Sequence, residues 1–147
     1  GVGGLIHALS GTENCRYIAM IYGLDPDEVL AFTIDLARIG RYMDMPVKTY
    51  SSTLQKRLSL ALLLSLDFDM YLVTGSNGLG DPEFAERAGP ILRQKLDGTP
   101  IFFMAANLNA FKAHCHRVAV VDDCKLYEFN SVDEAEIFLS EDALAHG

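Results

Sequence analysis

Apolar residues recur every three or four positions in the first part of the chain, which is the spacing of a helix with one apolar face. This part, about residues 11 to 66, is therefore predicted to be helical. We expect one helix over residues 13–22, a second from Pro26 and a third through about Leu66. The expected apolar stripes are Val29, Phe32, Leu36 and Ile39 in the second helix and Leu54, Leu58, Ala61, Leu62 and Ser65 in the third.

Capping residues set the expected ends of these helices. Thr12 is the predicted N-cap of the first helix, and Gly23 ends it, because glycine readily adopts the left-handed conformation found there. Asp25 is expected to cap the second helix. Either Ser51 or Ser52 is expected to cap the third.

The pattern changes after Asp69, where short apolar runs alternate with helical segments. Strands alternating with helices imply a parallel sheet. A final helix is expected to start at Ser131, with Glu134 at the capping-box position. The other expected elements are strands at Met70–Val73, Ile101–Met104, Val118–Val121 and Leu126–Phe129, and helices at Asp81–Leu96 and Asn107–His116.

Length and composition fit one globular domain. The chain has 147 residues, of which 50% are hydrophobic, and a net charge of −8. So acidic a chain repels phosphate backbones, so no nucleic-acid partner is expected. No run approaches the ~20 apolar residues that span a bilayer, and no secretory signal pattern is present. The three cysteines are expected to be reduced thiols in a cytosolic protein.

A glycine turn, "TGSNGLG" from Thr74 to Gly80, follows the first expected strand. Short-chain dehydrogenases use such a turn to bring the backbone close to the pyrophosphate of NAD(P). The context argues against this interpretation. The turn lies late in the chain, no Tyr-x-x-x-Lys pair supplies a catalytic base, and "FFMAAN" places no acid after the second strand.

A longer motif precedes that turn, "PVKTYSSTLQKRLSLALLLSLDFDMYLV" from Pro46 to Val73. It resembles the signature helix and Walker B strand of ABC transporter ATPases, above all the subunits that export capsular polysaccharide and lipopolysaccharide O-antigen. "LSGTENCRYIAMIYGLDPDEV" resembles the segment after their Q-loop, and "GLGD" occupies the place of the D-loop. "CHRVAVVDDCKLYEFNSVDEAEIFL" resembles their closing strands and helix. The resemblance covers nearly the whole chain but only the second part of such a subunit.

The resemblance implies that the catalytic positions are replaced. The magnesium-ordering aspartate of Walker B corresponds to Thr74 and the adjacent catalytic glutamate to Gly75. The switch histidine corresponds to Ala106 and the Q-loop glutamine to Ile6. The glycine of the signature that approaches nucleotide corresponds to Thr53.

Other positions of the family pattern are kept. Ser51 and Ser52 of the signature and Asp81 of the D-loop remain. No G-x-x-x-x-G-K-[ST] motif occurs in this sequence, and the Walker A loop of such a subunit would lie upstream.

The expected fold is therefore an α/β, partial P-loop fold like that of ABC ATPases. A single domain over 1–147 is predicted, with a helical subdomain over 11–66 and an α/β portion over 67–147 that holds an incomplete, mainly parallel sheet. Without the Walker A strand, sheet edges would be exposed. We expect a partner chain, a swapped copy or an upstream segment to fill that gap.

The expected function is that of a degenerate, non-hydrolysing ABC-ATPase-like module tied to polysaccharide export, acting through protein contacts. No cofactor is expected, with ATP and magnesium bound only if residues in trans complete the site. The alternative is the nucleotide-binding subunit of a capsular polysaccharide exporter completed in this way, and an NAD(P)-binding protein is a distant third. The resemblance implies a membrane permease docking on the helical subdomain, and a cytoplasmic location at the inner face of the membrane.

Three further groups invite a functional interpretation but are expected to be ordinary. Asp67 and Asp69 are expected to be the solvated end of a helix rather than a paired-carboxylate site. The possible metal ligands His114, Cys115, His116 and Cys124 fit no standard zinc spacing, so packing is expected there.

Lys56 and Arg57 are expected on the exposed side of the signature helix, although they could bind phosphate. Tyr17, Tyr22, Tyr42 and Phe32 are expected to form core between the first two helices, and a groove for a partner's helix is left open as the alternative.

Overall fold

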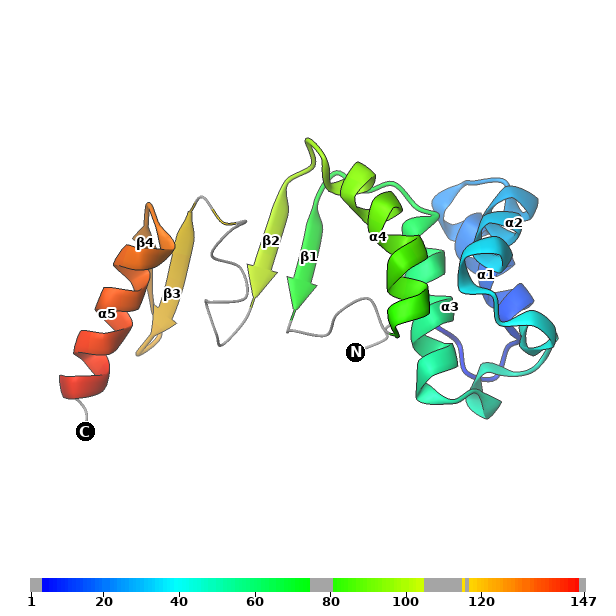
Figure 1. The fold of residues 1–147 in the computed structure, drawn as a ribbon, viewed down its shortest axis with the longest axis horizontal. Helices are drawn as coiled ribbons and strands as arrows, with labels where there is room; N and C mark the ends of the chain where they lie inside the picture. Colours follow the sequence, from blue (N-terminus) through cyan, green and yellow to red (C-terminus); the bar gives the residue numbers. More distant parts are fainter. Residues whose placement is uncertain (1–3, 75–80, 105–114, 116, 146–147) are drawn as a thin grey trace. The chain divides into compact units, whose positions relative to one another are not determined.

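The computed structural model describes residues 4–74, 81–104, 115 and 117–145, and the chain forms two compact units. The first contains Gly1–Tyr71 and Asn77–Phe102, and the second contains Leu72–Ser76 and Phe103–Gly147. Figure 1 shows the elements of each unit. Within the described residues, no helix is long and apolar enough to span a bilayer.

Helix α1 (Gly11–Tyr22) starts two residues earlier than the sequence predicted, and its N-cap is Ser10 rather than Thr12. The Ser10 hydroxyl accepts a hydrogen bond from the Glu13 N–H at 3.1 Å, and the Glu13 carboxylate accepts one from the Ser10 N–H at 2.7 Å. Ser10, rather than Thr12, is the N-cap because this reciprocal capping box satisfies two otherwise unpaired N–H groups. Gly23 ends the helix in the left-handed conformation, as predicted.

The caps of the next two helices are confirmed. Asp25 caps α2 (Pro26–Ala37) and accepts hydrogen bonds from the N–H groups of Asp27 and Glu28. Ser51 caps α3 (Ser52–Leu64), which ends two residues before the predicted Leu66. Two short 3₁₀ helices, η1 (Gly40–Asp44) and η2 (Val47–Thr49), connect α2 to α3.

The core of the first unit lies between α1, α2, α3 and α4 (Pro82–Leu96). Helix α4, predicted as part of the α/β portion, packs on α2 and α3 through Phe84 and Ala88, which are fully buried. Each helix therefore buries the face that its apolar spacing marks. Further buried members of this core are Cys15, Ala19, Val29, Leu36, Leu58, Ala61, Leu62 and Leu64.

The aromatic residues of this unit are only partly where the sequence placed them. Phe32 and Tyr42 pack against the core, as expected. Tyr17 and Tyr22 are exposed, so their assignment to the core was wrong. Tyr17 lies on the side of α1 opposite the buried Cys15 and Ala19, a difference that periodicity cannot resolve when both faces of a helix carry apolar residues.

Strands β1 (Tyr71–Thr74) and β2 (Ile101–Met104) are hydrogen-bonded neighbours. Their arrows point the same way in Figure 1, and α4 connects them, which makes β1–α4–β2 a βαβ unit. Strand β1 is shifted by one residue from its predicted limits, and β2 matches its prediction. The helix predicted at Asn107–His116 falls almost wholly outside the described residues.

The second unit contains an antiparallel hairpin and a helix. Strands β3 (Val118–Asp122) and β4 (Lys125–Phe129) pair with Val120 opposite Tyr127. Asp123 and Cys124 turn the chain with φ of 42° and 58°, and positive φ at both positions is the geometry that matches the twist of a hairpin.

Helix α5 (Val132–Ala145) closes this unit. Tyr127 and Phe129 of β4 contact Phe138, with ring centroids 4.7 and 5.3 Å apart. Ser131 accepts a hydrogen bond from the Glu134 N–H, as predicted. The Glu134 carboxylate accepts its bond from the N–H of Asn130, one residue earlier than in a standard capping box.

Two helical glycines allow a matched test of packing in the first unit. A Cβ at Gly11 would lie 2.8 Å from the Tyr50 hydroxyl and 3.3 Å from Met43 Cα, and that hydroxyl donates to the Tyr42 carbonyl. Gly11→Ala is therefore expected to lower the free energy of unfolding by about 1–3 kcal/mol, measured by urea denaturation.

Gly89→Ala in α4 is the control, because its Cβ would meet no atom within 4 Å beyond its chain neighbours. The helix propensity gained is offset by the following Pro90, so we expect a change within about 0.5 kcal/mol. Equal effects of the two variants would contradict the packing at Gly11.

Candidate functional site

The signature-like residues lie at the N-terminus of α3. Ser51 is the N-cap, and its hydroxyl accepts a hydrogen bond from the Leu54 N–H at 3.3 Å. Ser52 and Thr53 occupy the first turn, and all three residues are exposed. Exposed N–H groups and hydroxyls at the start of a helix are suited to an anion. This end of α3 is therefore accessible, and the exposed Thr53 side chain lies there beside the two serines.

The D-loop-like Asp81 is the N-cap of α4, and both oxygens of its carboxylate accept hydrogen bonds. Its Oδ1 accepts from the Phe84 N–H at 3.2 Å, which caps the helix. Its two oxygens also bind Arg57, with Nε to Oδ2 at 2.7 Å and Nη2 to Oδ1 at 2.6 Å. This is the two-point geometry in which a guanidinium holds a carboxylate most firmly.

Arg57 is the main correction that the structure makes to the site. Its side chain is only 14% exposed and lies between α3 and the start of α4, so the prediction that it decorates a solvated face was wrong. Arg57 also binds Glu83 at 2.9 Å, and Glu83 binds Arg87 at 2.8 Å. Arg87 donates to the carbonyl of Leu36 in α2. We call these side chains the Arg57 network: Arg57, Asp81, Glu83 and Arg87.

The Arg57 network fixes the ionisation of its carboxylates. Hydrogen bonds from Arg57 lower the pKa of Asp81 to about 2, and Arg57 and then Arg87 lower the pKa of Glu83. The same contacts raise the pKa of Arg57 above its already high ordinary value. A carboxylate held this far into its ionised form is a poor proton acceptor, and both oxygens of Asp81 already accept hydrogen bonds.

Ile6, the Q-loop-like residue, is held by its backbone. The Ile6 N–H donates to Asn14 Oδ1 at 2.7 Å, and Asn14 Nδ2 donates to the Ile6 carbonyl at 3.1 Å and the Ser10 carbonyl at 2.8 Å. Asn14 is fully buried in α1. It therefore fixes the backbone at residue 6 while the isoleucine side chain supplies no polar group.

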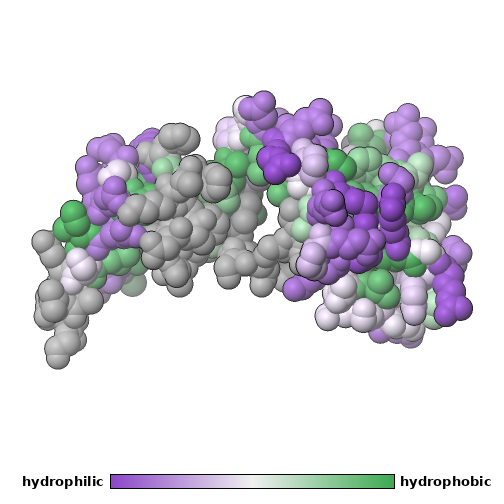
Figure 2. Space-filling model, viewed as in Figure 1, coloured by the Kyte–Doolittle hydropathy of each residue, from purple (hydrophilic) through white to green (hydrophobic). Residues whose placement is uncertain are grey.

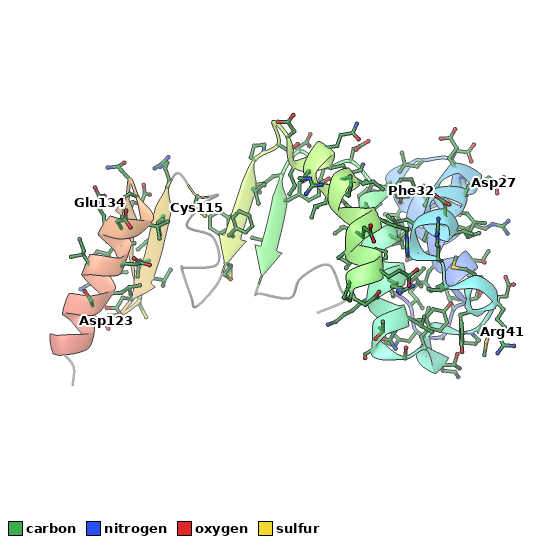
Figure 3. The ribbon with its side chains drawn as sticks, in the orientation of Figure 1. Asp27, Phe32, Arg41, Cys115, Asp123 and Glu134 are labelled. Carbon is green, nitrogen blue, oxygen red and sulfur yellow. The ribbon has the colours of Figure 1, made fainter. Side chains whose placement is uncertain are left out.

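The remaining candidates include one described residue of β1 and two residues outside the described part of the chain. Thr74 is the last residue of β1, and Gly75 and Ala106 lie outside the described residues. Among the described residues, no group of three histidine, cysteine or acidic side chains could hold a metal ion. Cys115, labelled in Figure 3, is partly buried, and this burial raises the pKa of its thiol.

Cys124 is exposed in the β3–β4 turn, and His114 and His116 lie outside the described residues. Asp67 and Asp69 are exposed after α3, as predicted, and Asp67 pairs with Lys95. Lys95 also donates to the Leu66 carbonyl at 2.8 Å, so this contact joins the end of α3 to α4. The two acids therefore lie just after the end of α3.

Comparison with known proteins identifies homologues of the chain. The ATP-binding protein BexA of Haemophilus influenzae is 34% identical over 134 residues, which are 91% of this chain and 62% of that protein. The capsule polysaccharide export ATP-binding protein CtrD of Neisseria meningitidis is 35% identical over 87% of this chain and 59% of its own length. The chain is a homologue of the ABC ATP-binding proteins of capsule export.

Further comparisons agree with this kinship. The polysialic acid transport ATP-binding protein KpsT of Escherichia coli is 32% identical over 81% of this chain and 54% of its own length. No protein-family model matches the chain. The chain thus spans between half and two thirds of the relatives it matches, and the family resemblance drawn from Pro46–Val73 is confirmed.

Solved structures confirm the fold class. An ATP-binding subunit of an ABC transporter superposes with a TM-score of 0.69 at 18% identity, covering 91% of this chain and 58% of that one. An ATP-binding cassette solved as a dimer in a post-hydrolysis state with ADP and Pi gives a TM-score of 0.59 at 17% identity, covering 86% of this chain and 58% of that one. The chain has part of the fold of an ABC ATPase.

Two neighbouring cations on α3, Lys56 and Arg57, allow a test of the Arg57 network. Arg57→Ala leaves Asp81 and Glu83 without their guanidinium, whereas Lys56 makes no ion pair among the described residues. We expect Arg57→Ala to lower the thermal midpoint clearly more than Lys56→Ala does, measured by circular dichroism. Equal effects would mean that the network does not join α3 to α4.

Acid should weaken the same network in a defined range of pH. The Asp81 pKa is about 2 in the folded chain against an ordinary 3.8, so its ionisation favours the folded state above pH 3.8 and ceases to do so as the pH falls towards 2. The stability difference between wild type and Asp81→Asn is expected to shrink over that interval, measured by urea denaturation. In an Arg57→Gln background, the stability difference caused by Asp81→Asn should change little with pH. If it still shrinks as the pH falls, the pH dependence belongs to another group.

Proposed function

We propose that this chain is a non-hydrolysing module of the ABC-ATPase type in capsule polysaccharide export, and that it acts through protein contacts. The proposal rests on the way in which Asp81, the acid at the D-loop position, is bound. Both oxygens of Asp81 are bound by Arg57, while the Walker B positions hold Thr74 and Gly75. Asp81, held in this way, is not positioned to take over the role of the replaced acids.

Hydrolysis of ATP needs groups that these positions do not provide. Magnesium prefers carboxylate and phosphate oxygens, and the attacking water must be oriented and polarised by a hydrogen-bond acceptor. Neither threonine nor glycine supplies a carboxylate, and alanine at position 106 cannot contact a γ-phosphate as histidine does. Several replacements that all remove the same chemistry support the loss of hydrolysis more strongly than any one of them.

The transport system in which the chain is proposed to work is suggested by the names of its relatives. Their names describe ATP-binding proteins of capsule polysaccharide export and polysialic acid transport. We infer that the chain works beside a membrane permease, at the inner face of the cytoplasmic membrane. The helical part, with its exposed apolar side chains on α1, is the proposed docking region.

A second candidate function keeps nucleotide binding. The start of α3 is exposed at Ser51, Ser52 and Thr53, so a phosphate held by another chain could reach it. One structural relative is a dimer with ADP and Pi bound, which supports such an arrangement. In this alternative, residues supplied in trans complete the site. The NAD(P) interpretation of Thr74–Gly80 is set aside because the homologues are ATP-binding proteins.

A ligand-stabilisation series separates these functions. A ligand that binds only the folded chain at ~100 times its dissociation constant stabilises it by about 2.7 kcal/mol. We expect no shift of the thermal midpoint with Mg-ATP, Mg-ADP, NAD or NADP, and no release of phosphate from ATP.

A shift with Mg-ATP that Ser52→Ala removes would support the second function and overturn the first. Ser59→Ala, in the same helix but away from its N-terminus, is the matched control and should leave such a shift unchanged. A shift with NAD alone would restore the dinucleotide interpretation.

A further inference from the structure

Among the described residues, Asn14 and Thr33 are the polar residues that are fully buried. Polar side chains of this unit otherwise gather on its surface, which the hydrophilic areas in Figure 2 show. Burying an amide costs free energy unless its donors and its acceptor are paired. The amide of Asn14 is paired, and its partners lie in the backbone that leads into α1.

The side chain of Asn14 closes residues 6–10 into a loop against α1. Its Oδ1 accepts the hydrogen bond from the Ile6 N–H, and its Nδ2 donates to the carbonyls of Ile6 and Ser10. The Leu9 carbonyl lies 3.5 Å from the same Nδ2. One N–H group and several carbonyls around the amide leave a single way to orient it, so the loop has one fixed arrangement.

The same loop holds the segment that leads into α3. The Val47 N–H donates to the Leu9 carbonyl at 2.9 Å, and the Lys48 N–H donates to the His7 carbonyl at 2.9 Å. The backbone of residues 6–10 therefore bonds to Asn14 on one side and to a distant part of the sequence on the other.

These contacts continue to the N-cap of α3. The Tyr50 N–H donates to the Val47 carbonyl at 3.0 Å. Gln55 Nε2, in α3, lies 3.5 Å from the Val47 carbonyl and 3.3 Å from the Tyr50 carbonyl. Tyr50 directly precedes Ser51, which caps the helix. The position of the cap thus depends on Val47, which is itself fully buried.

We propose that Asn14 is a positioning residue, which sets the place of residues 46–50, and so of the exposed start of α3, through the backbone of residues 6–10. We call Asn14, residues 6–10 and residues 46–50 the Asn14 bracket. Its parts open together because each is hydrogen-bonded to the next. The Q-loop-like Ile6 and the signature-like Ser51 then move as one piece. The inference goes beyond the proposed function and holds whether or not this end of α3 binds a ligand.

The bracket differs in a measurable way from ordinary packing of a buried residue. A residue that only fills space in a helix affects the stability of its whole unit, so its loss speeds hydrogen exchange at every amide that opens with that unit. Loss of the bracket speeds exchange at the amides of the bracket above all. Exchange at individual amides, measured by NMR, therefore separates the two roles.

The wild-type chain gives the first test. Exchange is followed over a series of low urea concentrations, which reports the free energy and the extent of each opening. The amides of Ile6, Val47 and Lys48 are expected to share one opening free energy and one urea dependence. Opening of Ile6 that differs from that of the other two amides would overturn the proposal.

Two buried polar residues give the second test. Asn14→Leu removes the donors and the acceptor at similar volume and leaves the Ile6 N–H unpaired. Exchange at Val47 and Lys48 is expected to become roughly tenfold faster relative to amides inside α4, because an unpaired buried group is costly. Thr33→Val is the control, since Thr33 is equally buried but lies in α2, outside the bracket. It should leave that ratio unchanged.

Either of two results with Asn14→Leu would overturn the proposal. Equal acceleration at the amides of α4 would show that Asn14 acts on overall stability alone. Unchanged exchange at Val47 and Lys48 would show that residues 6–10 hold residues 46–50 without it.

The far end of the bracket gives a test that does not alter Asn14. Gln55→Leu removes the contacts with the Val47 and Tyr50 carbonyls. If the bracket opens as one piece, exchange at the Ile6 amide is expected to become roughly threefold faster relative to amides inside α4, as the loss of weak hydrogen bonds predicts. An unchanged ratio at Ile6 would end the bracket before α3 and overturn its role in placing that helix.

Discussion

The contact between Arg57 and Asp81 ties the helical unit together. A single guanidinium in the middle of α3 holds both oxygens of the residue that caps α4, and the chain of ion pairs continues through Glu83 and Arg87 to the end of α2. Three helices are thereby fixed relative to one another at their polar ends, while Phe84 and Leu58 fill the apolar space between them. The start of α3, with its exposed serines, is positioned by this contact.

The contact also determines what the site can do. The carboxylate of Asp81 caps α4 and accepts two bonds from Arg57, so it holds α3 and α4 together. The positions at which the family resemblance places the Walker B acids hold Thr74 and Gly75. The helical unit packs through apolar side chains elsewhere in the chain, so its fold does not depend on acids at those two positions.

What remains distinctive is the surface. Helix α1 leaves the large apolar side chains of Tyr17, Met20 and Ile21 exposed, and neighbouring exposed apolar side chains are typical of an interaction surface. The same helix meets its neighbours through Cys15, Ala19 and the partly buried Ile18.

The sequence by itself determined the order of helices and strands, most caps, the β3–β4 turn and the family, because these depend on local spacing and on short motifs such as that at Pro46–Val73. It placed Asp25 and Ser51 correctly, since a cap and its helix are neighbours in the chain. It misjudged Thr12, Arg57, Tyr17 and Tyr22. The error at Thr12 was local, because the capping box of Ser10 and Glu13 lies within four consecutive residues. Only the tertiary structure decided the other three, because the partner of Arg57 is 24 residues away and the side of α1 that is buried depends on where α2 packs.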